Sequence, residues 1–226
     1  MGLITVLSCG IVFSVLMSYK KLSYAAVFHP ASNSVISTIL VLLIPLLLTI
    51  GGAVFWIADI TNLLLIYYPT DENEYRMFAR LMSGGVASII TICIIAPFIE
   101  EMLFRGIILK SFLVNYSTNR SIILSALLFS AYHLTITQLP VTFIVGCLFG
   151  WLYVRTRSLW PCILGHALYN SFAMLLWSRY YSANNQAMSF SPEFNPVSVM
   201  IVSILSSTIG GFMLISILKS KEKARS

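Results

Sequence analysis

Charged residues are scarce in this sequence of 226 residues. Asp, Glu, Lys and Arg make up 10% of it, and hydrophobic residues make up 58%. Soluble domains carry about 25% charged residues, and a soluble fold of this length would have too little polar surface to cover itself. The composition therefore excludes a soluble globular protein. We predict an all-α fold, a polytopic membrane helical bundle that forms one integral membrane domain over residues 1–226.

Several other features are missing. The four cysteines each stand alone in an apolar run, without a CxxC pair, so neither a disulfide framework nor a thiolate metal site is indicated. The helical zinc motif HExxH is absent. No internal repeat is visible, which argues against a transporter built from repeats. Binding to nucleic acid needs a basic face on the protein, and the positive net charge is explained without one. We therefore expect no nucleic-acid partner.

Long apolar runs are what the sequence does contain, and we read them as spans in contact with the lipid bilayer. About 20 residues are needed to cross the hydrocarbon. We favour seven crossings, with eight if 35–68 folds as a helical hairpin. The predicted spans are Gly2–Tyr19, Val35–Ile57 with an apolar extension to Tyr68, Leu81–Ile99, Ser121–Gln138, the short Val141–Val154, Leu159–Ser178 and Val197–Leu218.

The basic residues predict the orientation. Lys and Arg favour the inner side of a membrane. With seven crossings and the N-terminus outside, 11 of the 14 basic residues fall inside, and the C-terminus is inside too. This topology explains the net charge of +6. Lysines follow the first apolar run rather than precede it, so we expect this run to be a retained helix and not a secretory signal.

Ionisable and amide side chains inside the spans are the candidates for function, because they are costly in lipid. Three pairs are four residues apart and so share a helix face: Glu101 and Arg105, Phe129 and His133, and His166 and Asn170. Glu101 and Arg105 are spaced for an ion pair, which leaves Glu100, about 100° around the helix, without that partner. The full set is Asp59, Glu100, Glu101, Arg105, His133, Gln138, His166 and Asn170.

Depth counted from the basic boundaries brings three of these residues into one layer. At about 1.5 Å per residue, Glu100, His133 deep in the fourth span and His166 lie roughly 15, 20 and 14 Å from the inner surface. Alone, a buried histidine is more often a packing residue. Their agreement in depth favours a shared site. Asp59 has no visible partner and is read as interfacial or at a helix end, and His29 as a surface loop residue.

Three motifs in this order resemble the CPBP family of CAAX proteases and bacteriocin-processing enzymes, also called Abi. They are EEMLFR at 100–105, FSAYH at 129–133 and HALYN at 166–170, and RSLWP at 157–161 is also typical of bacterial members. The resemblance covers about residues 81–178, the expected catalytic core. It implies an intramembrane endopeptidase in the cell membrane, and the compact chain is similar to bacterial members.

The resemblance also implies roles. Glu100 would activate a water molecule with help from His133, His166 and Asn170 would stabilise the oxyanion, and Glu101 and Arg105 would support the helix. We favour no cofactor. A divalent metal such as zinc is the alternative, with Glu100, His133 and His166 as its ligands.

The expected substrate is a membrane-associated peptide or protein, in bacteriocin immunity or in peptide maturation. Its sequence and any lipid on it are open, as is the oligomeric state. Two other functions stay open: a proteolytically silent scaffold that binds a membrane partner, and a transporter that uses the same groups as a proton relay.

Overall fold

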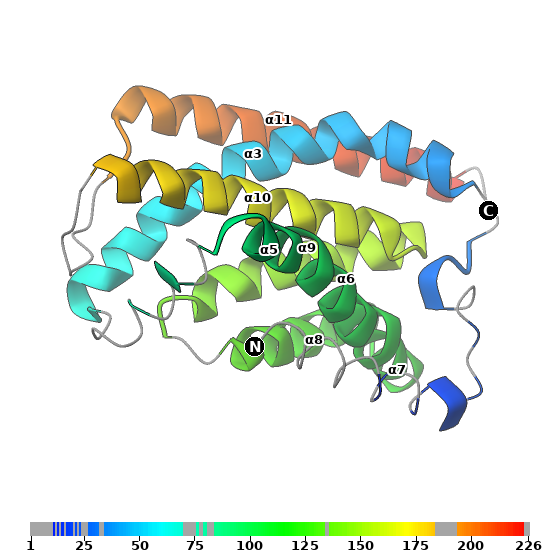
Figure 1. Cartoon of the computed structure of the whole chain (residues 1–226). Helices are drawn as coiled ribbons and strands as arrows, with labels where there is room; N and C mark the ends of the chain where they lie inside the picture. Colours follow the sequence, from blue (N-terminus) through cyan, green and yellow to red (C-terminus); the bar gives the residue numbers. More distant parts are fainter. Residues whose placement is uncertain are drawn as a thin grey trace.

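The computed structural model describes residues 34–69, 84–133, 136–183 and 194–223, with scattered positions in 11–31 and 76–80. Side chains are described to residue 178 in the third range and to 219 in the fourth. The predicted first span, Cys9 and the loop acids Asp71, Glu72 and Glu74 lie wholly or mostly outside these ranges. Within them every regular element is a helix, so the predicted helical membrane bundle is confirmed (Figure 1).

Helix α3, Val35–Tyr67, is one continuous helix of 33 residues. At about 1.5 Å per residue it is about 50 Å long, more than the ~30 Å of bilayer hydrocarbon. The hairpin alternative for 35–68 is therefore wrong, because no turn interrupts the helix. Tyr68 donates its N–H to the Leu64 carbonyl and ends the helix just before Pro69, as expected for a residue that precedes proline.

Helix α11, Val197–Lys223, packs along α3 at close range (Figure 1). A Cβ placed on Gly52 would lie 2.4 Å from the Ser203 carbonyl oxygen, and one on Gly210 would lie 2.5 Å from the Thr49 nitrogen. Only glycine allows this approach. Small residues at such contacts are the usual means of helix association in membranes, so close backbone approach contributes to holding the α3–α11 pair.

The segment Gly85–Asn115 is a second long helix, but its winding changes along its length. It runs through α5 (Gly85–Ile90), η1 (Thr91–Ile95), α6 (Ala96–Glu101), η2 (Met102–Leu109) and α7 (Lys110–Asn115), where η marks a π-helix. Single π turns inside α-helices are frequent at functional sites. The two π segments flank α6, the short piece that carries Glu100 and Glu101.

Three further helices surround this segment: α8 (Thr118–Tyr132), α9 (Leu139–Thr156) and α10 (Trp160–Ala183). Helix α8 is shorter than the predicted span Ser121–Gln138. It ends at Tyr132, and His133 occupies the C-cap position. The next helix begins at Leu139 and is longer than the predicted Val141–Val154. Residues 133–138 mix Leu134 and Ile136 with polar side chains, and the predicted span extends across them.

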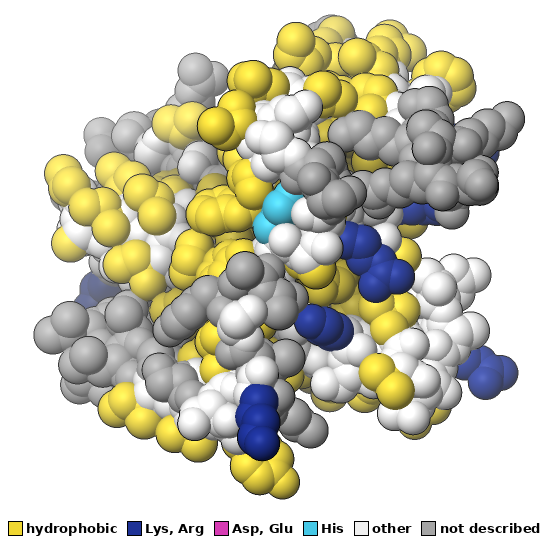
Figure 2. All heavy atoms as spheres, turned by 90° about the vertical axis from the view of Figure 1, so that its right-hand side faces the viewer, with side chains coloured by type: hydrophobic (Ala, Val, Ile, Leu, Met, Phe, Trp, Pro, Cys, Tyr) yellow, Lys and Arg dark blue, Asp and Glu magenta, His cyan; other side chains and the backbone are white. Residues whose placement is uncertain are grey.

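Four helices in the described part of the chain are long and apolar enough to cross a membrane: α3, Gly85–Asn115, α9 and Val197–Lys219 of α11. Basic side chains gather at one end of the bundle. Figure 2 looks at that end, on the right in Figure 1, where the charged side chains that show among the described residues are those of Lys and Arg. Arg155 is in the last turn of α9, and Arg157 is at the C-cap of that helix.

Candidate active site

A buried carboxylate, that of Glu101, lies at the centre of the polar groups in the bundle. Its Oε1 accepts a hydrogen bond from Arg105 Nη1 at 2.7 Å, and neither side chain has solvent-accessible surface. This is the ion pair that the i,i+4 spacing predicts. Arg105 also donates Nη2–H to the Gly146 carbonyl of α9 at 3.0 Å. The arginine therefore ties the EExxxR segment to a neighbouring helix.

The same Glu101 Oε1 lies 2.9 Å from His166 Nδ1 on α10. Because Glu101 is paired with a guanidinium that stays protonated, its carboxylate accepts, and the Nδ1 of His166 carries the proton. This contact was not predicted from the sequence, where Glu101 was assigned to Arg105 alone. An orienting carboxylate on Nδ1 fixes both the tautomer and the direction of an imidazole ring, so Nε2 of His166 is the nitrogen left for chemistry.

Glu100 faces that nitrogen. Its Oε2 lies 3.8 Å from His166 Nε2, too far for a direct hydrogen bond. The oxygen is buried and has no hydrogen-bond partner in the described part of the protein. Two atoms 3.8 Å apart can each lie about 2.8 Å from a shared third atom, which is the geometry a bound water would need. The structure thus brings Glu100 and His166 together from two helices.

His133 contacts the ring of Phe129, which also contacts His166. Its Nδ1 lies 2.9 Å from the Phe129 carbonyl one turn earlier. A carbonyl only accepts, so this nitrogen is the protonated one and Nε2 has the free lone pair. The Phe129 ring contacts both histidines, with centroid distances of 4.9 Å to His133 and 5.8 Å to His166. The ring of His133 is also within electrostatic range of Glu100.

Two phenylalanines enclose the ionic groups. The guanidinium carbon of Arg105 lies 4.6 Å from the Phe129 ring centroid and 5.6 Å from that of Phe149. Phe149 stacks on His166 at 5.5 Å. Cation–π contacts of this kind strengthen when water is excluded. The phenylalanine of FxxxH therefore has a direct structural task, which is to hold the arginine and both imidazoles in place.

Asn170 is one turn beyond His166, but its amide points to a different neighbour. Its Nδ2 donates to the Ile92 carbonyl in η1 at 2.8 Å. Ser125 of α8 makes a comparable contact and donates to the Phe104 carbonyl in η2 at 3.1 Å. Each π segment thus has one carbonyl held by a side chain of another helix. The hydropathy pattern does not reveal π winding, but Pro97 beside η1 indicates an irregular helix at this point.

The N-terminal side of the chain contributes a strap that was not predicted from the sequence. The Phe28 carbonyl accepts the Leu159 N–H at 2.9 Å, and His29 Nδ1 lies 2.8 Å from Ser158 Oγ. The Phe28 ring packs on Phe98 at a centroid distance of 5.1 Å, two residues before Glu100. His29 is thus a packing residue of the turn between α9 and α10, and the stretch 157–161 serves to hold this strap.

The residues proposed as metal ligands do not form a metal site here. Among the described residues no three His, Cys, Asp or Glu side chains are close enough to hold one ion. Glu100 and His166 approach each other, but His133 is not placed as a third ligand. Both histidines have Nε2 available, and an imidazole nitrogen is a usual zinc ligand. The types of donor therefore fit a zinc site, but their arrangement does not.

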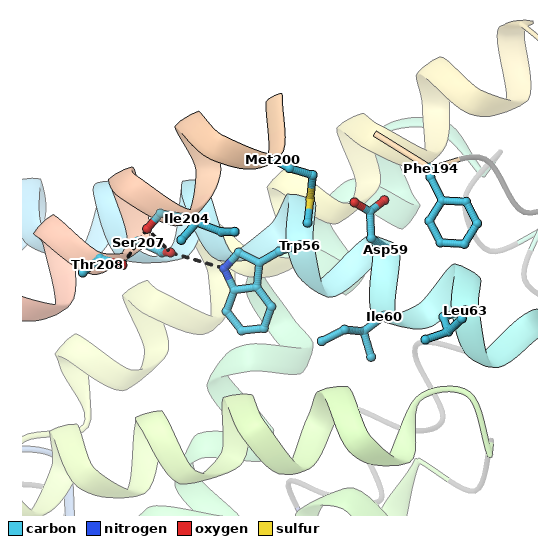
Figure 3. Close-up of a pocket in the computed structure, with 9 residues that line it drawn as sticks. All are labelled: Trp56, Asp59, Ile60, Leu63, Phe194, Met200, Ile204, Ser207 and Thr208. Carbon is cyan, nitrogen blue, oxygen red and sulfur yellow. Dashed lines mark hydrogen bonds between the residues drawn. The ribbon is translucent and has the colours of Figure 1, made fainter. Parts of the chain in front are cut away.

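Asp59 lies apart from this group, where α3 meets the start of α11 (Figure 3). Its Oδ1 accepts from both the backbone nitrogen and Nδ2 of Asn195, at 3.0 and 2.9 Å. The reading of Asp59 as an acid without a partner is therefore wrong, because the partner lies 136 residues away. A groove of about 530 Å³ runs beside it, lined mostly by apolar side chains of α3 and α11.

Comparison with known proteins bears on the segment that holds the site. Residues 82–172 match a family model described as "Type II CAAX prenyl endopeptidase Rce1-like". The segment is Rce1-like. This confirms the resemblance drawn from the three motifs, and the Rce1-like segment contains all six residues of the candidate site. A relative named "Putative membrane peptidase YdiL" from Bacillus subtilis (strain 168) is 28% identical over 88 residues.

The aligned region covers 39% of this chain and 36% of that relative, so the chain matches about a third of the relative's length. No solved structure matches the chain. The Rce1-like segment ends before the C-terminal part of α10, and α3 and α11 lie outside it. The comparisons therefore concern the helices that carry the ionic groups, and they say nothing of the α3–α11 pair.

Proposed function

We propose that the protein is an intramembrane endopeptidase that hydrolyses peptide bonds of a membrane-associated peptide or protein. One observation carries the proposal: a buried carboxylate oxygen, Glu100 Oε2, is without a hydrogen-bond partner among the described residues and lies 3.8 Å from His166 Nε2. Both residues lie within the Rce1-like segment. A buried carboxylate oxygen without a hydrogen-bond partner is costly. A role as the base that takes a proton from the attacking water would explain this arrangement of Glu100.

In the proposed reaction, a water molecule between Glu100 and His166 attacks the carbonyl carbon of the scissile bond. Glu100 takes one proton from that water as the new C–O bond forms. The carbonyl oxygen gains the negative charge. Collapse of the intermediate breaks the C–N bond, and Glu100 returns the proton to the leaving amine. Such acid–base catalysis contributes about 10²–10⁴ to the rate.

The two histidines have different tasks in this scheme. His133 has a free Nε2, and the resemblance to the CPBP family assigns it a supporting role in activating the water. His166 has its Nδ1–H held by Glu101, and a proton on Nε2 would make it a cationic donor for the oxyanion. The resemblance to the CPBP family assigns Asn170 to the oxyanion as well. Glu101 acts through His166, so it is a positioning residue.

We propose a mechanism without a metal, because the described donors do not converge on one point. The alternative remains a zinc-dependent hydrolysis that uses Glu100, His133 and His166. The two mechanisms differ in their response to chelation. After exhaustive treatment with a chelator, confirmed by elemental analysis, the metal-free mechanism retains full activity, and the zinc mechanism loses it.

The substrate and the setting follow from the surroundings of the site. Glu100 lies near the middle of a helix that is long enough to cross a bilayer, so the scissile bond must enter the membrane. We propose a bacterial cell membrane with the basic end of the bundle inside, as the face in Figure 2 supports. A role in bacteriocin immunity or peptide maturation, and the cleavage of prenylated CAAX substrates that the family description suggests, are both compatible with this site.

The test is the substitution Glu100→Gln, which keeps the shape of the side chain and removes the base. Membrane-associated peptides from cells with each variant are compared by mass spectrometry. We expect an uncleaved precursor to accumulate and cleavage to fall by about 10³-fold, with normal amounts of the variant protein. Asp59→Asn is the matched control, since it makes the same chemical change in an acid outside the site. Identical peptide profiles for all three proteins would instead favour a silent scaffold.

A further inference from the structure

The helix that carries Glu100 contains a gap in its own hydrogen bonding. At the end of η1, the N–H of Ala96 bonds to the Thr91 carbonyl, five residues back. The next residue is Pro97, at the start of α6. Proline has no N–H to donate. The gap thus falls where π winding changes back to α winding, three residues before Glu100.

One carbonyl, that of Ile92, loses both of its possible partners within the helix. In α winding its donor would be Ala96, whose N–H already bonds to Thr91. In π winding its donor would be residue 97, which is proline. A carbonyl that is shielded from water and has no donor destabilises the fold. Asn170 Nδ2, from α10, lies 2.8 Å from this oxygen and supplies the missing hydrogen bond.

We propose that Asn170 is a positioning residue whose amide replaces the missing N–H of Pro97 and so holds the π turn that directs Glu100 and Glu101 toward His166. One extra residue in a turn rotates everything after it by about 100° relative to unbroken α winding. Without η1, a different face of α6 would meet α10. Asn170 and His166 are on the same helix, one turn apart, so this bond also sets how far α6 lies from His166.

This role differs from donation to the oxyanion, and it rests on the proposed function only for its activity measurement. The two roles separate at residue 97. If Asn170 replaces a backbone donor, then Pro97→Ala, which restores that donor, removes most of the need for Asn170. If Asn170 serves the oxyanion instead, the residue at position 97 has no influence on the loss.

The experiment is a double-mutant cycle with Asn170→Leu, which keeps a branched side chain of similar size without a donor. Thermal unfolding in detergent is measured for the wild type, Pro97→Ala, Asn170→Leu and the double variant. We expect Asn170→Leu to lower the unfolding midpoint by about 2–6 °C. We expect the double variant to recover at least half of that shift. Pro45→Ala, at the proline inside α3, is the matched control and should recover none.

Cleavage of the wild-type substrate gives a second readout. Because small displacements of catalytic groups cost about 100-fold in rate, we expect such a loss for Asn170→Leu and partial recovery with Pro97→Ala. If Asn170→Leu does not fold, the same cycle with Asn170→Ala is used. A shift from the Asn170 substitution that is equal with and without Pro97→Ala overturns the proposal. The unfolding cycle answers the question even if the wild type cleaves nothing, so failure of the proposed function is seen separately.

Discussion

Asp59 and Glu100 are two acids on different helices of this bundle, and their surroundings differ. Asp59, on α3, receives two hydrogen bonds from Asn195 at its Oδ1. Glu100, on α6, has an Oε2 that receives none in the described structure and faces an imidazole nitrogen at 3.8 Å. Both acids are costly in a membrane. The hydrogen bonds from Asn195 offset the cost of burying Asp59. Glu100 Oε2 has no such donor among the described residues and can bind a ligand.

The helices that carry these acids differ in the same way. Helix α3 keeps α winding over 33 residues and meets α11 through Gly52 and Gly210. The segment Gly85–Asn115 changes winding four times, and side chains of α8 and α10 hold the freed carbonyls. We infer that the α3–α11 pair supplies stability alone, whereas the Rce1-like segment supplies the chemistry and also depends on its own buried ion pair for stability. Each prediction below tests one of the two regions.

The largest effect on stability is expected at the ion pair in the Rce1-like segment. Arg105→Ala would leave Glu101 buried with only His166 as its partner. Removal of one member of a fully buried pair costs about 3–5 kcal/mol. Arg120, which is exposed at the start of α8, provides the control Arg120→Ala, with an expected change below about 0.5 kcal/mol. Unfolding by heat in detergent measures both, and equal midpoints would contradict a buried pair.

The ion pair of Glu101 and Arg105 shows which contacts a sequence pattern can predict. The i,i+4 spacing of Glu101 and Arg105 is local, so it predicts the contact directly. The contact of Glu101 with His166 joins residues 65 positions apart, and no spacing rule reports it. The partner of Asp59 was missed for the same reason. The end of α8 at Tyr132 was also missed, because the predicted span extends across residues 133–138 to Gln138.

An intermediate effect is expected at the glycine contact between α3 and α11. Gly52→Ala would push a methyl group to 2.4 Å from the Ser203 carbonyl oxygen, a contact with backbone that cannot move aside. Overpacking of this kind costs about 1–3 kcal/mol. Gly211→Ala is the matched control, because a Cβ there meets nothing within 4 Å. We expect Gly52→Ala to lower the unfolding midpoint while the cleavage rate per folded molecule is unchanged. A lowered rate per folded molecule would contradict the division between the two regions.

The smallest effect is expected at the acid that already has its donors. Asn195→Ala removes the 2.9 Å bond to Asp59 and the weaker 3.2 Å bond to the Phe55 carbonyl, but it keeps the backbone donor. Loss of a hydrogen bond to a charged group costs about 1.5–3 kcal/mol when the group is fully buried. Here the remaining donor limits the loss to about 1 kcal/mol. Asp59→Asn combined with Asn195→Ala should cost less than the sum of the two single changes, because the contact is shared. Additive losses would mean that a residue other than Asn195 holds Asp59. The comparison with Glu100 would then have to use that other residue.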